Sequence, residues 1–181
     1  MRRYWLCRNL LCLSFLLWGG SAFASPSAFP ETAAHFSVGY NGNLIGSVGG
    51  EYFFSTRYSD GSLDLTVYAD TDDLYGARLS GTALVFPALG TEPPLALGVG
   101  ADVGVDSRET QFHVGIVLGN DLLFVFDVPM TVSGYLAPGY SFSKGFSLAW
   151  AFQVRYYFRD VALEVASTDL LPVSVGVRYL F

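Results

Sequence analysis

Apolar and polar residues alternate along most of the chain beyond residue 32, which is the pattern of β-strands rather than of helices. The last ten residues show it most clearly, because alternate positions there hold only apolar side chains: Val173, Val175, Val177, Tyr179 and Phe181. The positions between them include the polar residues Ser174 and Arg178. Successive side chains of a strand point to opposite faces, so this segment predicts a strand with one apolar face and one mostly polar face.

Turn signals divide the preceding residues into further strands, and Asn41-Gly42-Asn43 is the strongest hairpin signal among them. Residues 120–129 follow neither a strand pattern nor a helix pattern clearly. We expect about ten antiparallel strands, with eight as the alternative count. Their expected ranges are 33–40, 44–54, 62–70, 74–86, 95–105, 110–118, 130–142, 146–158, 161–166 and a last strand that ends at residue 181.

Charge separates between the two faces of these strands. The more apolar face of each strand carries no charge, whereas the opposite face holds small residues and most of the charged ones. The polar side chains assigned to that face are Glu51, Asp64, Asp70, Arg78, Asp102, His113, Gln153, Arg155, Glu164 and Arg178. Small and polar residues suit a narrow interior and bulky apolar ones suit an exterior in lipid, so the pattern predicts a closed transmembrane β-barrel. Glycines at 98, 100 and 104 are expected to leave room for an arginine to cross the lumen.

The N-terminus has the features of a secretory signal peptide. A basic start is followed by an apolar stretch over residues 10–18 and by a small-x-small motif at 22–24, which predicts cleavage after Ala24. The apolar stretch is too short for a membrane-spanning helix, which needs about 20 residues. We therefore expect a signal peptide at 1–24 and a single barrel domain at 25–181. Both cysteines, Cys7 and Cys12, lie in the peptide, so we expect no disulfide and no thiolate-bound zinc in the mature chain.

The composition agrees with a membrane barrel and argues against a nucleic-acid partner. Only 14% of residues are charged, against about 25% in typical soluble domains, and 16% are aromatic. The net charge is −6, and the predicted signal peptide carries three of the ten Lys and Arg residues but none of the 16 Asp and Glu residues. A nucleic-acid-binding protein needs a basic patch, and Lys144 is the only lysine in the chain.

The terminal strand resembles the C-terminal signature of bacterial outer-membrane barrels, with Phe181 at the end and an aromatic residue, Tyr179, two positions before it. This resemblance implies recognition by the barrel assembly machinery. The mature chain resembles small barrels of the OmpA/OmpX type and is comparable in length to YfaZ-type barrels. The resemblance implies export through the Sec pathway, periplasmic chaperones, and a monomer that is integral to the outer membrane. There it would contact lipid and lipopolysaccharide, with both termini on the periplasmic side.

The predicted lumen charges are the strongest indication of function. We assign to a lumen network or pore lining the residues Glu51, Asp64, Arg78, Asp102, His113, Arg155, Glu164 and Arg178. Their arginines could bridge the carboxylates and close the lumen, or surplus acid could line a thin path that prefers cations. The predicted function is a small outer-membrane barrel of a structural or narrow-pore, porin-like type, with a net acidic lumen and short loops. A secreted lipocalin-like ligand-binding barrel is one alternative, although it would need outer faces rich in Lys and Glu.

An outer-membrane lipid-modifying enzyme is the other alternative. His113 is expected to lie beside Asp102, which fits either a catalytic pair or, as we favour, a hydrogen-bonded network. Lipid A deacylases place a Ser two residues from a His on the lipid-facing surface, but Gly115 occupies that position after His113. His35 has Ser37 at that spacing, yet both are expected to face the lumen with no acid beside them. We therefore expect no enzyme and no catalytic residue.

We expect no metal or cofactor either. The acidic residues at 70, 72 and 73 offer carboxylate oxygens of the kind that calcium prefers. A solvated turn is the interpretation that we favour for them, because Asp side chains readily hydrogen-bond the backbone of a turn.

Overall fold

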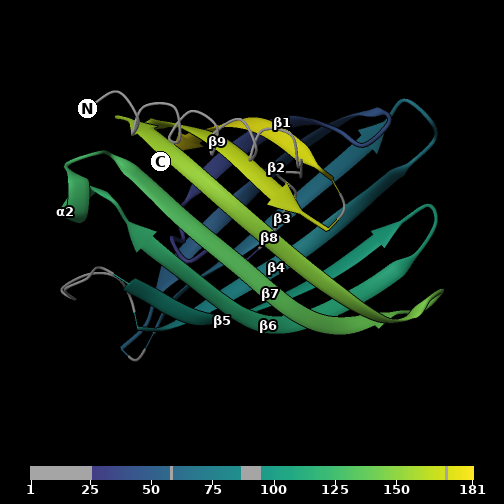
Figure 1. The fold of residues 1–181 in the computed structure, drawn as a ribbon, viewed down its shortest axis with the longest axis horizontal. Coiled ribbons are helices and arrows are strands. Elements are labelled where there is room, and N and C mark those ends of the chain that lie inside the picture. Colours follow the sequence, from purple (N-terminus) through teal and green to yellow (C-terminus); the bar gives the residue numbers. More distant parts are fainter. Residues whose placement is uncertain (1–25, 58, 87–94, 170) are drawn as a thin grey trace, which may run out of the picture.

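The computed structural model describes residues 26–57, 59–86, 95–169 and 171–181. They form a closed antiparallel barrel of ten strands (Figure 1). The expected signal peptide at 1–24 and the connection at 87–94 lie outside the described residues. Within the described part of the chain, no helix is long and apolar enough to cross a membrane.

The strands follow the predicted ranges to within three residues at each end. They are β1 (Ala33–Tyr40), β2 (Leu44–Ser55), β3 (Asp60–Asp70), β4 (Tyr75–Phe86), β5 (Leu95–Asp106), β6 (Thr110–Asp121), β7 (Met130–Ser141), β8 (Gly145–Phe158), β9 (Val161–Thr168) and β10 (Val173–Leu180). The unclear stretch at 120–129 contains the end of β6 and a short helix, α2 (Leu123–Phe126). The expected count of ten is confirmed and the alternative of eight is wrong.

Each strand pairs with its neighbours in sequence, and β1 closes the barrel by pairing antiparallel with β10, from Ala33 opposite Leu180 to Tyr40 opposite Val173. Closure gives every strand a partner on both sides, which a sheet in hydrocarbon needs because an unpaired backbone group there is costly. The lengths are unequal, since β7 and β8 have 12 and 14 residues whereas β9 and β10 have 8 each. β8 therefore extends beyond β9 at one end of the barrel.

The side chains face as the alternation predicts. On β10, Arg178 points inward and is 3% exposed, whereas its neighbours Val177 and Tyr179 point outward and are 44% and 52% exposed. The outer surface is a belt of large apolar side chains, and most of the buried residues are small or polar. This inside-out distribution suits a barrel that is surrounded by lipid.

The two ends of the barrel differ. The C-terminus lies at one end, beside the start of β1, where the backbone N–H of Phe181 bonds the carbonyl oxygen of Thr32 (3.0 Å) (Figure 1); we call it the terminal end. The opposite, distal end holds the turns that join β1 to β2, β3 to β4, β5 to β6, β7 to β8 and β9 to β10. At this end Gly42 and Gly145 adopt positive φ angles of 77° and 82°, a conformation that glycine tolerates best.

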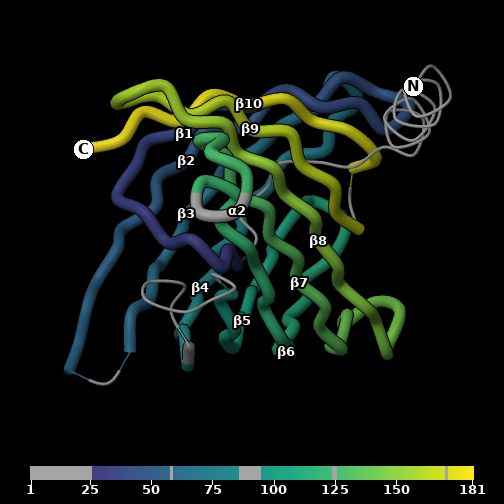
Figure 2. The backbone as a smooth tube through the Cα atoms, turned by 60° about the vertical axis from the view of Figure 1, so that its left-hand side comes forward, coloured from purple at the N-terminus to yellow at the C-terminus, as the bar shows by residue number. Residues whose placement is uncertain are grey.

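Residues 26–32, which we call the N-terminal segment, run inside the barrel before the chain enters β1 (Figure 2). Ala28 is buried against wall residues that include Ala96, Val117 and Tyr135. A Cβ atom at Gly119 would lie 2.4 Å from the Ala28 Cβ, and one at Gly100 would lie 2.5 Å from the Pro26 Cβ. Inner-face glycines of β5 and β6 therefore make room for this segment.

The expectation that glycines 98, 100 and 104 leave room for a crossing arginine is wrong for two of the three. A Cβ at Gly98 would meet Leu84, and one at Gly100 would meet Pro26. Of the three, only Gly104 lies near an arginine, since a Cβ added there would lie 4.0 Å from the Arg78 Cγ. The alternation shows that an inner position is small, but it does not show which group fills the space.

Candidate functional site in the barrel interior

Two arginines in the terminal half of the lumen bind three glutamates, and we call this set the glutamate–arginine cluster. Arg155 on β8 donates from Nε to Glu164 Oε2 at 2.7 Å. Arg178 on β10 donates to Glu51, and its Nη1 lies 3.5 Å from Glu164 Oε2. Glu31 of the N-terminal segment completes the cluster, with its Oε2 3.5 Å from Arg155 Nη1 and 3.7 Å from Arg178 Nε.

This cluster ties the N-terminal segment to the barrel wall. Besides the ion pair with Glu31, Arg155 donates from Nη1 to the carbonyl oxygen of Phe29 at 2.9 Å. Both arginines are almost fully buried, and removing one partner of a buried ion pair typically costs about 3–5 kcal/mol. The segment is thus held across the lumen by charge as well as by the packing of Ala28.

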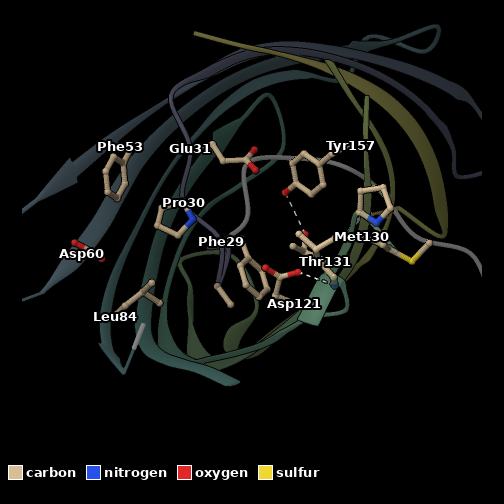
Figure 3. A pocket seen from close by; sticks show the side chains of 13 residues that line it. Phe29, Pro30, Glu31, Phe53, Asp60, Leu84, Asp121, Met130, Thr131 and Tyr157 are labelled. Atoms are coloured by element: carbon tan, nitrogen blue, oxygen red, sulfur yellow. Dashed lines mark hydrogen bonds between the residues drawn. The ribbon is translucent and has the colours of Figure 1, made fainter. Parts of the chain in front are cut away.

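A cavity of about 380 Å³ opens at the terminal end, beside the segment (Figure 3). Phe29, Pro30 and Glu31 form one part of its lining, and Asp121 and Tyr157 belong to the barrel wall around it. The Tyr157 hydroxyl pairs with Thr131 Oγ1 at 3.1 Å. The floor of this cavity is therefore partly made by residues that do not belong to the barrel.

A second cluster surrounds Asp102 on β5, deeper toward the distal end. Arg78 donates to Asp102 Oδ1 from Nε (3.0 Å) and from Nη2 (2.8 Å), and the Tyr135 hydroxyl donates to Oδ2 at 2.9 Å. His113 Nδ1 lies 3.1 Å from the same Oδ1, as the sequence predicts, and its Nε2 lies 2.9 Å from Ser147 Oγ. A carboxylate that binds a guanidinium accepts only, so His113 donates from Nδ1 and its Nε2 can accept from Ser147.

The other histidine does have an acid beside it, so the expectation that His35 has none is wrong. Its Nε2 lies 3.0 Å from Asp64 Oδ2, and Thr66 donates to Asp64 Oδ1 at 2.9 Å. His35 is on β1 and Asp64 on β3, and the ring crosses the strand between them at Gly49, where a Cβ would lie 2.6 Å from His35 Cε1. Ser37 does not join this group, because its hydroxyl pairs with Ser47 at 2.6 Å.

The distal mouth is lined by turns. Asp70 Oδ1 accepts from the backbone N–H groups of Asp72 (2.7 Å) and Leu74 (2.9 Å), so this acidic run caps its own turn. Among the described residues, no group of His, Cys, Asp and Glu is placed to hold a metal ion. A smaller cavity of about 240 Å³ lies here and is lined in part by Tyr68, Arg108 and Asp169.

Glu109 and Asp169, at this mouth, have pKa values shifted in opposite directions. Burial alone would raise the pKa of Glu109, but hydrogen bonds from Ser141, Lys144 and Ser143 outweigh it and hold the pKa below its usual range. Burial raises the pKa of the Asp169 carboxyl, and the Arg78 guanidinium, 3.8 Å away, opposes this effect only in part.

The structure places all eight predicted lumen residues on the inner face and divides them among these clusters. The described interior holds more acids than arginines, because Glu31 joins Glu51, Asp64, Asp102 and Glu164 against three arginines, whereas Asp70 lies at the rim. Sequence reasoning missed Glu31, Tyr135 and Ser147. The predicted 143–145 turn pairs residue 142 with 146 and so would set Ser147 opposite Ser141, whereas the structure sets it opposite Gly139. Glu31 precedes the first strand, and no strand pattern locates it.

Comparison with known proteins supports the fold. No protein-family model matches the chain, and no curated protein matches it. The structure is similar to a KdgM porin, with a TM-score of 0.52 and 13% identity over 82% of this chain and 99% of that one. A second similar structure, a KdgM porin in complex with disordered oligogalacturonate, has a TM-score of 0.53 at the same identity and coverage. The chain therefore shares the small barrel fold of these porins.

Proposed function

We propose that the chain is an integral outer-membrane protein, exported through the Sec pathway with removal of residues 1–24, and that it forms a narrow, cation-preferring channel. The N-terminal segment closes this channel in the conformation described. One observation carries the proposal: a segment that is not part of the barrel wall lies in the terminal half of the lumen and is held there by Arg155 and Arg178. A segment attached at one end can leave, whereas wall residues cannot.

The preference for cations follows from the interior charge. Acidic side chains outnumber arginines on the lumen face, and rings of carboxylates favour cations in a pore. A barrel of this strand count leaves little more space than its own side chains fill, so we expect passage of small ions only. Oligogalacturonate, named with the similar KdgM porin, carries a carboxylate on each sugar unit, and an acidic lumen would repel it.

A closed structural barrel is the second candidate, and the buried ion pairs favour it. Arg78, Arg155 and Arg178 each have carboxylate partners and are almost fully buried. These ion pairs fill the interior, and they would block the lumen if they persisted after the N-terminal segment was displaced.

Planar-bilayer conductance separates the two candidates. The full chain is expressed, recovered from the outer membrane by fractionation, and shown to be folded by heat-modifiable gel mobility. We expect small, rare channel events that favour K⁺ over Cl⁻, and more frequent events when residues 26–31 are deleted or Glu31→Gln removes the ion pairs to both arginines. Glu109→Gln, at the distal rim, is the matched control.

The outcomes discriminate between the two candidates and test the proposed location. Folded protein that shows no events above background in any of these forms is a structural barrel. A preference for Cl⁻ would contradict the acidic lumen as the selective element. Recovery of the mature protein in the soluble periplasmic fraction would overturn the proposed membrane location.

A further inference from the structure

We infer that Ser147, His113 and Asp102 form a nucleophilic triad at the distal end of the lumen, able to cleave carboxylic esters that carry an apolar acyl chain. The inference goes beyond the proposed channel and does not depend on it. It rests on the row that these three residues make across the sheet, and on the exposure of only one of them.

The three side chains lie in one register row across four neighbouring strands. Asp102 on β5 pairs with His113 on β6, His113 pairs with Gly139 on β7, and Gly139 pairs with Ser147 on β8. The hydrogen bonds run along this row, with 3.1 Å from Asp102 Oδ1 to His113 Nδ1 and 2.9 Å from His113 Nε2 to Ser147 Oγ. An acid, an imidazole and a hydroxyl in this order are the parts of an activated serine.

Gly139 is what allows the imidazole to reach the serine. A Cβ at this position would lie 2.3 Å from His113 Cδ2 and 2.8 Å from Cγ. The ring therefore lies directly over the β7 backbone, in space that any other residue would occupy. Because position 139 has no side chain, the histidine on β6 can reach a serine on β8, two strands away.

The directions of the hydrogen bonds around Asp102 and His113 allow His113 to act as a general base. Arg78 and Tyr135 both donate to Asp102, which keeps that carboxylate an acceptor. His113 then donates from Nδ1, which orients the ring and leaves the Nε2 lone pair for the serine hydroxyl. His35 lacks this arrangement, because both Asp64 and the Thr66 hydroxyl, at 3.4 Å, lie at its Nε2.

The three residues differ in solvent exposure, as a catalytic triad requires, because only the nucleophile has to be accessible. His113 and Asp102 are 1% and 2% exposed, whereas Ser147 is only half-buried and stands two residues from the distal start of β8. β7 pairs with residues 145–149 on one side, but β9 pairs with β8 only from Ala151 onward, so no described strand lies beside these residues on the β9 side. The serine is thus next to an open edge where the lumen meets the outer surface.

The surroundings of this edge define the substrate class. Phe146 and Leu148 flank Ser147 on the outer face and are 77% and 51% exposed. An acyl chain lying along these apolar side chains would bring its ester carbonyl to the rim beside Ser147. Membrane lipids present esters of this kind at the depth where chains meet head groups.

The reaction balances with groups that are present. Ser147 Oγ bonds to the ester carbonyl carbon as its proton moves to His113 Nε2. The C–O bond to the alcohol then breaks, and His113 returns the proton to the leaving oxygen. Water, activated by the same imidazole, then releases the carboxylic acid and restores the serine.

A backbone N–H is available for the transient oxyanion. Trp150 accepts a hydrogen bond at its carbonyl oxygen from the Asp169 N–H (3.0 Å), so backbone groups of even-numbered residues in this part of β8 point away from β7. The N–H of Leu148 points the same way, toward the open edge. It belongs to the residue after the nucleophile, and a preorganised N–H donor is the usual stabiliser of such an oxyanion.

A fluorophosphonate probe tests the nucleophile directly. The full chain is purified from membranes in detergent, checked for heat-modifiable mobility, labelled and digested for mass spectrometry. We expect an adduct on Ser147 that Ser147→Ala abolishes and that His113→Gln slows by about 10²-fold or more, the usual contribution of a general base. Gly139→Ala should also slow labelling, because the added Cβ displaces the imidazole.

Ser141→Ala is the matched control. Ser141 lies at the same end of the lumen, but its hydroxyl bonds Glu109 rather than a histidine, so labelling should be unchanged. Turnover is then measured with p-nitrophenyl esters of short and long acyl chains, and the long-chain ester should be hydrolysed faster. Folded protein with no adduct on Ser147, or with equal labelling in His113→Gln, would overturn the triad, and a preference for the short chain would overturn the substrate class.

Discussion

Arg155 Nη1 donates a hydrogen bond to the carbonyl oxygen of Phe29, 2.9 Å away, although 126 positions separate the two residues. The contact joins the wall of the barrel to a segment that precedes its first strand. Arg155 also binds Glu164 and Glu31, so one buried guanidinium links β8, β9 and the N-terminal segment.

Replacing Arg155 with Gln should lower the free energy of unfolding by about 3–5 kcal/mol, since it leaves buried carboxylates without their partner. Urea unfolding of the folded barrel in detergent, followed by gel mobility, measures the effect. Arg159→Gln is the control, because Arg159 lies exposed in the turn between β8 and β9. If both variants unfold at the same urea concentration, the ion pairs contribute little to stability.

Replacing Val175 with Arg should destabilise the barrel in a bilayer by about 2–4 kcal/mol, the cost of an arginine on the lipid face near the midplane. Val175 points outward and is 57% exposed. Val175→Leu keeps the face apolar and serves as the control. Folding into lipid vesicles, measured across a urea series, gives the difference. Equal folding of the two variants would contradict the assignment of this face to lipid.

Gly49→Ala should destabilise the fold by about 1–3 kcal/mol through overpacking, whereas Gly46→Ala should not. Both glycines are on β2, but a Cβ at Gly49 would lie 2.4 Å from the Leu65 carbonyl oxygen and 2.6 Å from His35 Cε1. A Cβ at Gly46 would meet nothing within 4 Å. Thermal unfolding in detergent compares them. A neutral Gly49→Ala would mean that His35 does not lie across β2 in solution.

Glu109 should stabilise the distal mouth at neutral pH and lose that effect in acid. Its pKa is held below the usual value, so the folded state favours the charged carboxylate. The contribution is present above the carboxyl pKa of the unfolded chain and disappears as pH falls through the lower folded value. Unfolding of the original chain and of Glu109→Gln is compared at pH 7 and pH 3. We expect a gap in the free energy of unfolding at pH 7 that is smaller at pH 3, and a gap of equal size at both would refute the assignment.

The sequence by itself determined the closed barrel, the strand ranges and the direction in which each side chain points. It could do so because a strand has a side-chain period of two, so a single apolar face such as Val175, Val177 and Tyr179 sets the register of the whole segment. It also placed His113 beside Asp102, since two neighbouring strands joined by a short turn leave little freedom of alignment.

Only the tertiary structure decided what fills the lumen and which charges meet there. The sequence predicted an acidic partner for Arg178, but the choice of Glu51 and Glu164 depends on how far a guanidinium reaches across a closed barrel. The entry of residues 26–32 into the lumen has no periodic signal, because that segment pairs with no strand. The link from His113 to Ser147 depends on the gap that Gly139 leaves, and such a gap exists only when three strands lie side by side.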